Sequence, residues 1–297
     1  MANVTRRISM YEGINLITAI ITPFTVNDEI DYESLEKLIE HLLNHGSQGF
    51  VIAGTTGESP TLSFEEKVEL TRFIAKQVGN RALLIANAGS NNTKESVEAA
   101  KALSKIEHIN GILAVTPYYN KPSQAGMIAH FKAIADASEK PVMLYNIPGR
   151  TVVGLTVDSV IELAQHPNIN AIKETTSTEF VEAEVEGATG FAVYTGEDAM
   201  TLSAYTVGGA GTISVASHLY GDEMSELFSA MNAGNWREAG RLQRYLTPRM
   251  NALFAYPSPT PVKTKLAEKG FVREAVRLPL IPLSDAEKLH LNELLEK

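Results

Sequence analysis

The sequence predicts an α/β protein, a (β/α)8 TIM barrel with a C-terminal helical extension. Short runs rich in β-branched residues alternate with longer amphipathic segments from about residue 15 to residue 235. Eight such strand–helix repeats are present, which is the number that closes a barrel. A doubly wound open sheet is the alternative, but no G-x-G-x-x-G sequence follows the first predicted strand, where that fold would carry its dinucleotide-binding turn.

The predicted strands are short, apolar and regularly spaced. They are Leu16–Pro23, Gly49–Gly54, Ala82–Ala88, Gly111–Pro117, Val142–Ile147, Ala171–Thr175, Ala192–Thr195 and Thr212–Val215. Helical periodicity lies between them. The segment Asp31–Gly46 carries leucine and isoleucine at helical spacing and stops at glycine. The segment Ser63–Gly79 opens with a capping box between Ser63 and Glu66.

The alternation of strands and helices ends after residue 235. Residues 236–256 predict a long helix that is stopped by three closely spaced prolines in YPSPTPVK, and residues 262–271 and 284–297 predict further helices. We therefore expect a barrel at residues 1–235 and a helical region at residues 236–297, which would pack on the barrel or against a neighbouring subunit.

Composition excludes several classes of protein. The chain of 297 residues has 26 Lys+Arg against 35 Asp+Glu and no basic block, so nucleic acid is not an expected partner. The absence of cysteine excludes disulfides, thiolate nucleophiles and cysteine-ligated metals. The N-terminal segment lacks the apolar stretch of a secretory signal, and no apolar run is long enough to span a bilayer. We expect a cytoplasmic protein without a membrane partner.

Lys173 ends an apolar strand in INAIKETT, and a charge near a protein interior is costly unless it is paired or used. A lysine in a partly apolar pocket loses proton affinity, and the neutral amine can attack a carbonyl to form a Schiff base. The alternative is a strand-terminal lysine that extends to solvent. The neighbouring strand ends favour the reactive amine.

Schiff-base chemistry needs proton transfer, and hydroxyl groups follow several of the predicted strands. Tyr145 ends the strand before the one that carries Lys173, and Thr55, Thr56 and Tyr119 would complete a chain of hydroxyls. Each has a structural alternative, because a tyrosine can be a core aromatic and the pair in TPYY can pack at an interface.

Two features near the strand ends suit small anions. Arg150, in YNIPGRT, has a guanidinium group that can hold a carboxylate with two hydrogen bonds, although a surface arginine is the simpler explanation of this residue taken alone. The glycines of GTTGE expose backbone N–H groups that suit a second anion. A small keto acid would use both features.

The ordered motifs GTTGES, TPYYNKPSQ, YNIPGRT, IKETT, TGEDA, GGAGTISV and PSPTPVK resemble the dihydrodipicolinate synthase and N-acetylneuraminate lyase family of class I aldolases. The resemblance covers essentially the whole chain. It implies that Lys173 forms a Schiff base with pyruvate, without cofactor or metal. It also implies that Tyr145 shuttles protons with the hydroxyls of Thr55 and Thr56 and with Tyr119.

The same resemblance implies an oligomer. In the family the tyrosine that matches Tyr119 is lent by the neighbouring subunit, so at least a dimer is required, and a homotetramer of tight dimers is the common assembly. Gly196 and Ile213 match residues that line the pyruvate pocket.

The second substrate divides the family. Synthases resemble this chain in TPYY and in the arginine of the YN-P-x-R segment, whereas neuraminate lyases differ at both places. Arg150 therefore favours aspartate semialdehyde, and the implied reaction is its condensation with pyruvate to 4-hydroxy-tetrahydrodipicolinate in lysine (diaminopimelate) biosynthesis. Another pyruvate-dependent aldolase, such as N-acetylneuraminate lyase or 2-keto-3-deoxygluconate aldolase, is the alternative.

Lysine-inhibited family members have a regulatory pocket at the tight dimer interface. Four residues match parts of it: Ser59, Asn91, Glu95 and Tyr118. The histidines of strongly inhibited members are replaced by Phe64 and Lys67, and a second cation beside bound lysine is unfavourable. We expect weak or absent feedback inhibition.

Two rival hypotheses remain. The first is a metal-dependent barrel enzyme that uses strand-end carboxylates as ligands for a hard cation, namely Glu58, Glu174, Glu197 and Asp198. The seven histidines form no HxH or HExxH pattern, which gives zinc chemistry little support. The second is a non-catalytic relative that binds a keto acid.

Overall fold

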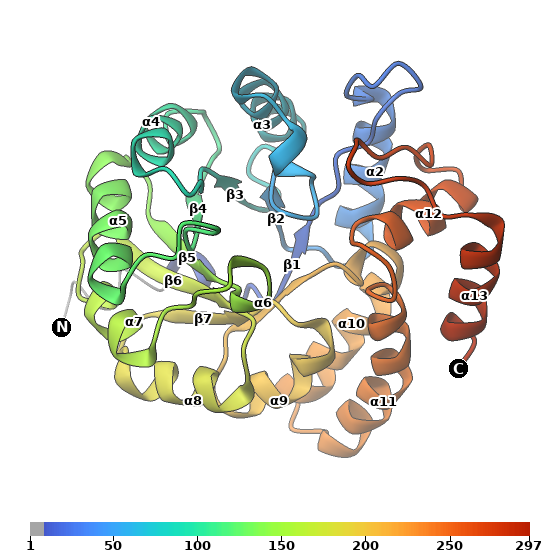
Figure 1. Cartoon of the computed structure of the whole chain (residues 1–297). Helices are drawn as coiled ribbons and strands as arrows, with labels where there is room; N and C mark the ends of the chain where they lie inside the picture. The colour runs from blue at the N-terminus through green and yellow to red at the C-terminus, as the bar shows by residue number, and fades with distance from the viewer. Residues whose placement is uncertain (1–8) are drawn as a thin grey trace. The chain divides into compact units, whose positions relative to one another are not determined.

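A computed structural model describes residues 9–297 of the chain. Its eight strands follow one another in chain order around a closed barrel, which confirms the predicted TIM barrel (Figure 1). The strands are β1 (Leu16–Ala19), β2 (Gly49–Ile52), β3 (Leu83–Asn87), β4 (Gly111–Val115), β5 (Val142–Asn146), β6 (Ile169–Glu174), β7 (Ala192–Thr195) and β8 (Gly211–Ser214).

The chain divides into two compact units. The first comprises Met1–Asn15 and Leu83–Ile213. In it β4, β5, β6 and β7 pair in parallel, each with the next. These strands are buried along almost their whole length, as expected of parallel strands that are covered on both faces.

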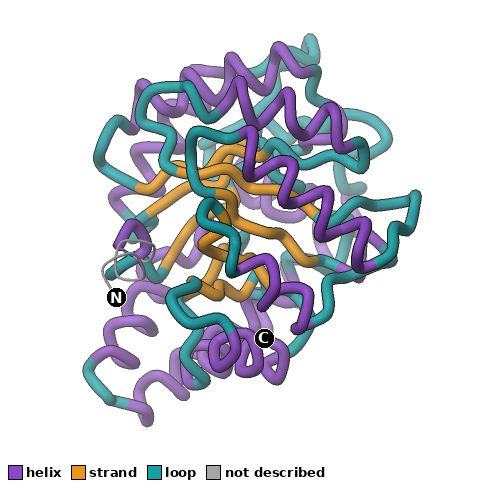
Figure 2. The backbone as a smooth tube through the Cα atoms, turned by 90° about the vertical axis from the view of Figure 1, so that its left-hand side faces the viewer, coloured by secondary structure: helices purple, strands orange, loops and turns teal. Residues whose placement is uncertain are grey.

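Helices of the first unit lie in succession outside its strands, and each contacts the next (Figures 1 and 2). They are α4 (Thr93–Leu103), α5 (Gln124–Ala137), α7 (Val157–Ala164), α8 (Thr178–Gly187) and α9 (Thr201–Thr206). The unit also has the four-residue helix α6 (Pro148–Thr151), which is not part of this succession, and the 3-10 helices η1 (Ser9–Tyr11) and η3 (Asp198–Met200). The phenol of Tyr194 on β7 donates to the carbonyl of Ile14, which fixes the N-terminal segment to this unit.

The second unit comprises Leu16–Ala82 and Ser214–Lys297. Here β1 pairs with β2 in parallel. Its helices are α2 (Tyr32–Asn44), η2 (Ser59–Thr61), α3 (Phe64–Val78), α10 (Ser217–Asn232), α11 (Trp236–Ala252), α12 (Thr260–Glu268) and α13 (Asp285–Leu295). The C-terminal helices pack on one another, with α11 between α10 and α13.

Helix ends agree well with their sequence signals. Asp31 caps α2 by accepting a hydrogen bond from the N–H of Ser34. Both halves of the predicted box between Ser63 and Glu66 are present at the start of α3. The helix predicted over 284–297 is α13, which opens with a second box formed by Ser284 and Glu287.

Several predicted boundaries were wrong. Most strands end one to four residues earlier than predicted, because the apolar run continues into the loop that follows. Strand β6 instead begins two residues earlier, since an irregularity between Val142 and Met143 lets Ile169 pair with Val142. Helix α11 ends at Ala252, before the proline-rich segment, although Pro248 lies inside it. The division of the chain after residue 235 stays a prediction.

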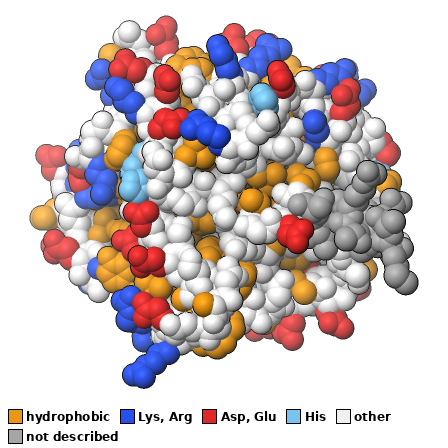
Figure 3. Space-filling view, turned by 180° about the vertical axis from the view of Figure 1, so that it is seen from behind, with side chains coloured by type: hydrophobic (Ala, Val, Ile, Leu, Met, Phe, Trp, Pro, Cys, Tyr) orange, Lys and Arg blue, Asp and Glu red, His pale blue; other side chains and the backbone are white. Residues whose placement is uncertain are grey.

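Charges on the face shown in Figure 3 are mixed, with Lys and Arg side chains scattered among Asp and Glu. In residues 9–297, no helix has both the length and the apolar character needed to cross a membrane.

Candidate active site

Lys173 and Tyr145 lie side by side on adjacent strands. The register of β5 and β6 pairs the Cα atoms of these two residues. Lys173 is 7% exposed and Tyr145 is 5% exposed, so both side chains are withdrawn from solvent. The Nζ atom of Lys173 lies 4.5 Å from the centroid of the Tyr145 ring. The structure therefore brings the predicted amine and the predicted phenol together, and the lysine does not extend to solvent.

Gly196, just after β7, leaves room for the lysine side chain. Its N–H donates to the carbonyl of Glu174 over 2.7 Å, which holds the β7 end against β6. A Cβ atom at Gly196 would lie 2.5 Å from Cε of Lys173 and 2.7 Å from Cγ2 of Thr175. Only glycine allows this close approach without displacing the lysine.

Glu174 fixes the turn that follows Lys173. One carboxylate oxygen accepts from the N–H groups of Thr175, at 2.7 Å, and Thr176, at 2.8 Å. The other accepts from Nδ2 of Asn146 at 2.8 Å, and the Oδ1 of Asn146 accepts from the N–H of Leu155. These contacts join the ends of β5 and β6, so they hold the backbone that carries Tyr145 and Lys173.

Glu184 on α8 is fully buried, and neither of its oxygens finds a donor among the described residues. Burial, together with the neighbouring Glu174 carboxylate, raises its pKa to about 10. Glu184 is therefore protonated at neutral pH and can donate its proton to Glu174. Nothing in the sequence signals this carboxyl pair, because the two residues belong to different elements.

The charges of Arg150 and Lys173 both influence the pKa of one carboxyl group, that of Glu197. Arg150 lies exposed on α6, and Glu197 follows Gly196 after β7. Partial burial raises the pKa of Glu197 and the charge of Asp198 adds to this, whereas the charges of Lys173 and Arg150 both lower it. Glu197, expected only as a metal ligand under the rival hypothesis, is thus part of the electrostatic surroundings of Lys173 and Arg150.

The remaining predicted pocket residues lie at strand ends in their own units. Ile213 is buried on β8 in the first unit. Thr55 and Thr56 follow β2 in the second unit; Thr55 is half-buried and Thr56 is buried. Each is thus found at the C-terminal end of a barrel strand, the end at which TIM-barrel enzymes carry their sites.

Tyr119 is the exception among the predicted catalytic residues, because its side chain is 87% exposed. Its backbone has a φ of 71°, an uncommon value for a bulky residue. This exposure means that the phenol is not packed with Lys173 and Tyr145 in the same chain.

The predicted regulatory residues of the first unit lie near one another. Nδ2 of Asn91 donates to the carbonyl of Tyr118 at 3.1 Å. Glu95 accepts from Ser90 and Asn92, on the same loop as Asn91. In the second unit, Ser59 is buried, Phe64 is 45% exposed, and Lys67 is half-buried on α3.

Two of the four metal ligands considered in the rival hypothesis are held by other partners. Glu58 pairs with Lys263, and Glu174 is held by N–H groups and Asn146. Within residues 9–297, no group of three or more His, Cys, Asp and Glu side chains is arranged to hold a metal ion.

Sequence and structure comparisons agree with this geometry. The profile of the Dihydrodipicolinate synthetase family matches residues 12–297. The chain belongs to the dihydrodipicolinate synthetase family. A 4-hydroxy-tetrahydrodipicolinate synthase of Leuconostoc citreum is 68% identical to it over 97% of this chain and 99% of the relative. The family resemblance predicted from the motifs is thus confirmed.

Solved structures of the family are similar over nearly their whole length. Dihydrodipicolinate synthase of Bacillus anthracis has a TM-score of 0.92 and 44% identity, over 95% of this chain and 97% of that chain. The chloride-inhibited enzyme of Acinetobacter baumannii, complexed with pyruvate, has a TM-score of 0.91 and 38% identity, also over 95% and 97%.

Replacement of Gly196 by alanine should displace the lysine without unfolding the protein. The new methyl group would meet Cε of the flexible Lys173 side chain and, slightly farther away, Cγ2 of Thr175, so the lysine is the group that yields most easily. We expect kcat/KM to fall at least about tenfold, since a shift of about 1 Å at a reacting group can cost a factor of about 100. Gly126→Ala on α5, where the methyl group makes only ordinary contacts, is the control. Equal activity of the two variants would contradict the assigned packing.

Glu184→Gln should change the pH dependence of stability. Because the folded-state pKa is raised from 4.5 to about 10, folding takes up a proton, and this contribution is lost as pH rises between those values. The slope is about 1.4 kcal/mol per pH unit. The amide keeps a donor toward Glu174 without titrating, so Tm of the wild type should fall relative to Glu184→Gln by roughly 3 °C per pH unit between about pH 6 and pH 9.

The control for this measurement is Glu182→Gln, since Glu182 is exposed on the same helix. Its Tm should follow that of the wild type at every pH. Parallel curves for the wild type and Glu184→Gln would show that no proton is held at Glu184.

Proposed function

We propose that the chain catalyses the condensation of pyruvate with aspartate semialdehyde to 4-hydroxy-tetrahydrodipicolinate, through a Schiff base on Lys173. It is then a lyase of the class I aldolase type in lysine (diaminopimelate) biosynthesis. The observation that carries the proposal is the buried Lys173 amine held over the ring of Tyr145. The family membership and the pyruvate complex of the Acinetobacter baumannii relative support the choice of pyruvate.

Catalysis begins when the neutral Lys173 amine attacks the ketone carbon of pyruvate. Loss of water gives an iminium ion, which withdraws electrons from the neighbouring methyl group. Removal of a methyl proton then gives an enamine, whose carbon attacks the aldehyde of the second substrate and restores the imine. The amino group of that substrate next attacks the imine carbon, which closes the ring and expels the Lys173 amine. These steps need a group that accepts and returns protons beside the lysine, and the Tyr145 phenol is the nearest candidate supported by the contacts.

Thr55, Thr56 and Tyr119 complete the proposed proton relay, with Thr56 also binding substrate. The fold supports this role for the threonines, because a TIM barrel gathers the C-terminal ends of its strands at one face. Tyr119 is supported differently. A phenol that is 87% exposed in one chain is available to a second copy, which agrees with a homo-oligomer in which each subunit lends this tyrosine to its neighbour.

Arg150 is the proposed anchor of the aspartate semialdehyde carboxylate. Its exposure leaves the guanidinium group accessible to a ligand, and its influence on Glu197 is shared with Lys173. Gly196 and Ile213 are the proposed lining of the pyruvate pocket.

The proposed enzyme uses no cofactor and no metal, because the lysine supplies the electron sink. We propose a homotetramer built from tight dimers, located in the cytoplasm. Its partners are the two substrates and copies of itself rather than nucleic acid or a membrane. The mixed charges of the visible face agree with the absence of a nucleic-acid surface there (Figure 3).

The decisive experiment is borohydride reduction with pyruvate followed by mass spectrometry. We expect one covalent adduct on Lys173 in the wild type and none in Lys173→Ala, because only an imine is reduced to a stable bond. Full activity after exhaustive chelation should accompany this result. A protein that forms no adduct but binds pyruvate would instead be a non-catalytic relative.

A coupled assay with aspartate semialdehyde, beside cleavage of N-acetylneuraminate and 2-keto-3-deoxygluconate, identifies the second substrate.

Feedback inhibition by lysine should be weak. Among the residues that match the regulatory pocket, Asn91, Glu95 and Tyr118 would recognise lysine, but Lys67 adds a cation and Phe64 removes a polar partner. We expect less than half inhibition at about 1 mM lysine in a steady-state assay with both substrates. Removing the cation in Lys67→Gln should increase the inhibition. Submillimolar inhibition of the wild type would contradict this prediction.

A further inference from the structure

The loop after β2 ends at a buried, charged and strained residue. Glu58 is 3% exposed and has a φ of 57°, in the left-handed region that favours glycine. A buried carboxylate and a left-handed backbone each cost free energy, and such costs often cluster at functional sites. Glu58 carries both costs two residues after Thr56.

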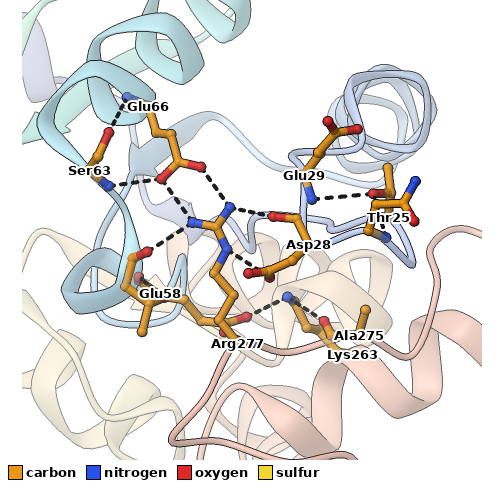
Figure 4. A network of polar contacts seen from close by, with 11 residues as sticks. Thr25, Asp28, Glu29, Glu58, Ser63, Glu66, Lys263, Ala275 and Arg277 are labelled. Atoms are coloured by element: carbon orange, nitrogen blue, oxygen red, sulfur yellow. Dashed lines mark hydrogen bonds and ion pairs between the residues drawn. The ribbon is translucent and has the colours of Figure 1, made fainter.

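The carboxylate of Glu58 is held from the C-terminal part of the chain. Its Oε1 pairs with Nζ of Lys263 on α12, a lysine that is only 1% exposed (Figure 4). Lys263 also donates to the carbonyl of Ala275 at 2.8 Å, and its Nζ lies 4.3 Å from the centroid of the Phe24 ring. The ammonium group is therefore enclosed by the carboxylate, a carbonyl and an aromatic face.

Arg277 supplies the second anchor. Its backbone N–H donates to Oε2 of Glu58 at 2.9 Å. Its guanidinium group donates to both carboxylate oxygens of Glu66 and to Asp28, and it also reaches the carbonyl of Thr61 (Figure 4). Both oxygens of Glu58 are thus satisfied by residues more than 200 positions away in the chain.

Backbone hydrogen bonds connect Glu58 to the turn that contains Thr55 and Thr56. Its N–H donates to the carbonyl of Thr55 at 3.0 Å, and the N–H of Ser59 donates to the carbonyl of Gly54 at 3.2 Å. The hydroxyl of Thr22 donates to the carbonyl of Gly57 at 2.7 Å. Thr55 and Thr56 therefore lie in a turn that is closed by Glu58, and the orientation of that turn depends on where the Glu58 side chain is held.

We infer that Glu58 and Lys263 are positioning residues that orient the hydroxyls of Thr55 and Thr56 for the reaction. Helix α12, which carries Lys263, would then set the geometry of the loop after β2. This inference rests on the proposed function. A pair of apolar residues would fill the same space without the desolvation cost of two ions. The ion pair instead fixes one orientation, since the carboxylate must meet Lys263 and the Arg277 N–H together.

The positive charge of Lys263 depends on its partner Glu58. Burial lowers the pKa of Lys263 to about 8, although the nearby Glu58 carboxylate opposes this shift. Removal of one partner leaves the other without its counter-charge in the interior. Loss of Lys263 frees one oxygen of Glu58 to turn toward solvent, and loss of the Glu58 carboxylate removes the anchor of the loop, so either change can carry Thr55 and Thr56 away from their places.

The test compares Lys263→Met and Glu58→Ala with the wild type. Lys265→Met is the matched control, because Lys265 lies on the same helix and pairs with Glu268 and Asn292 instead. We expect kcat to fall at least about tenfold in both test variants, as for a misplaced proton-transfer group. The pyruvate concentration that half-saturates borohydride trapping on Lys173 should rise by a smaller factor than kcat falls, since Lys173 and Tyr145 are untouched and only the contact of Thr56 with substrate is weakened. Lys265→Met should keep kcat within twofold.

The double variant Glu58→Gln with Lys263→Met separates positioning from a general loss of structure. It has no unpaired charge, and the amide oxygen still accepts from the Arg277 N–H, so kcat should recover by at least threefold over Lys263→Met. Unchanged kcat in Lys263→Met or Glu58→Ala, or a parallel loss of kcat and trapping, would overturn the inference. If Lys263→Met does not fold, Glu58→Ala decides. A wild type that gives no pyruvate adduct rejects the proposed function itself, whatever the variants do.

Discussion

The pairing of β5 with β6 is the constraint on which the candidate site depends. It places Tyr145 opposite Lys173, so a phenol and a buried amine meet without any help from a flexible loop. Parallel strands in a barrel are fixed by neighbours on both sides, and the two residues cannot separate unless the sheet opens. The chemistry needs the amine and the proton carrier within reach of the same small molecule, and this register provides it.

Adjacent residues on a strand point to opposite faces, and the site uses this rule. Lys173 points toward Tyr145, whereas Glu174 meets Asn146 and the carboxyl of Glu184 from α8. The two sides of β6 thus have different tasks. One side presents the amine of Lys173, and the other side holds the strand end in place through a carboxylate that accepts from N–H groups and a side-chain amide.

Much of this arrangement was predictable from the sequence, because it depends on chain order. In a barrel, consecutive strands are neighbours, so Tyr145 and Lys173 had to be close once their strands were recognised. The roles of Glu184 and Lys263 were not predictable in this way. Each meets its partner through packing of a helix, and the identity of that contact depends on helix rotation, which periodicity does not fix to one residue. The early start of β6 escaped prediction for a similar reason, since a local irregularity in pairing leaves no mark in composition.

Two buried glutamates near predicted catalytic residues, Glu174 and Glu58, are held by different kinds of partner. Their places in the chain explain the difference. Glu174 directly follows Lys173, so a cation bound to its carboxylate would lie close to a second positive group. Neutral N–H and amide donors hold it without adding charge. Glu58 closes a turn that carries only hydroxyls, so a lysine can serve as its partner there. The two sites thus differ in whether the partner of the glutamate is a further cation: the contacts of Glu174 add none beside Lys173, whereas Glu58 is paired with Lys263.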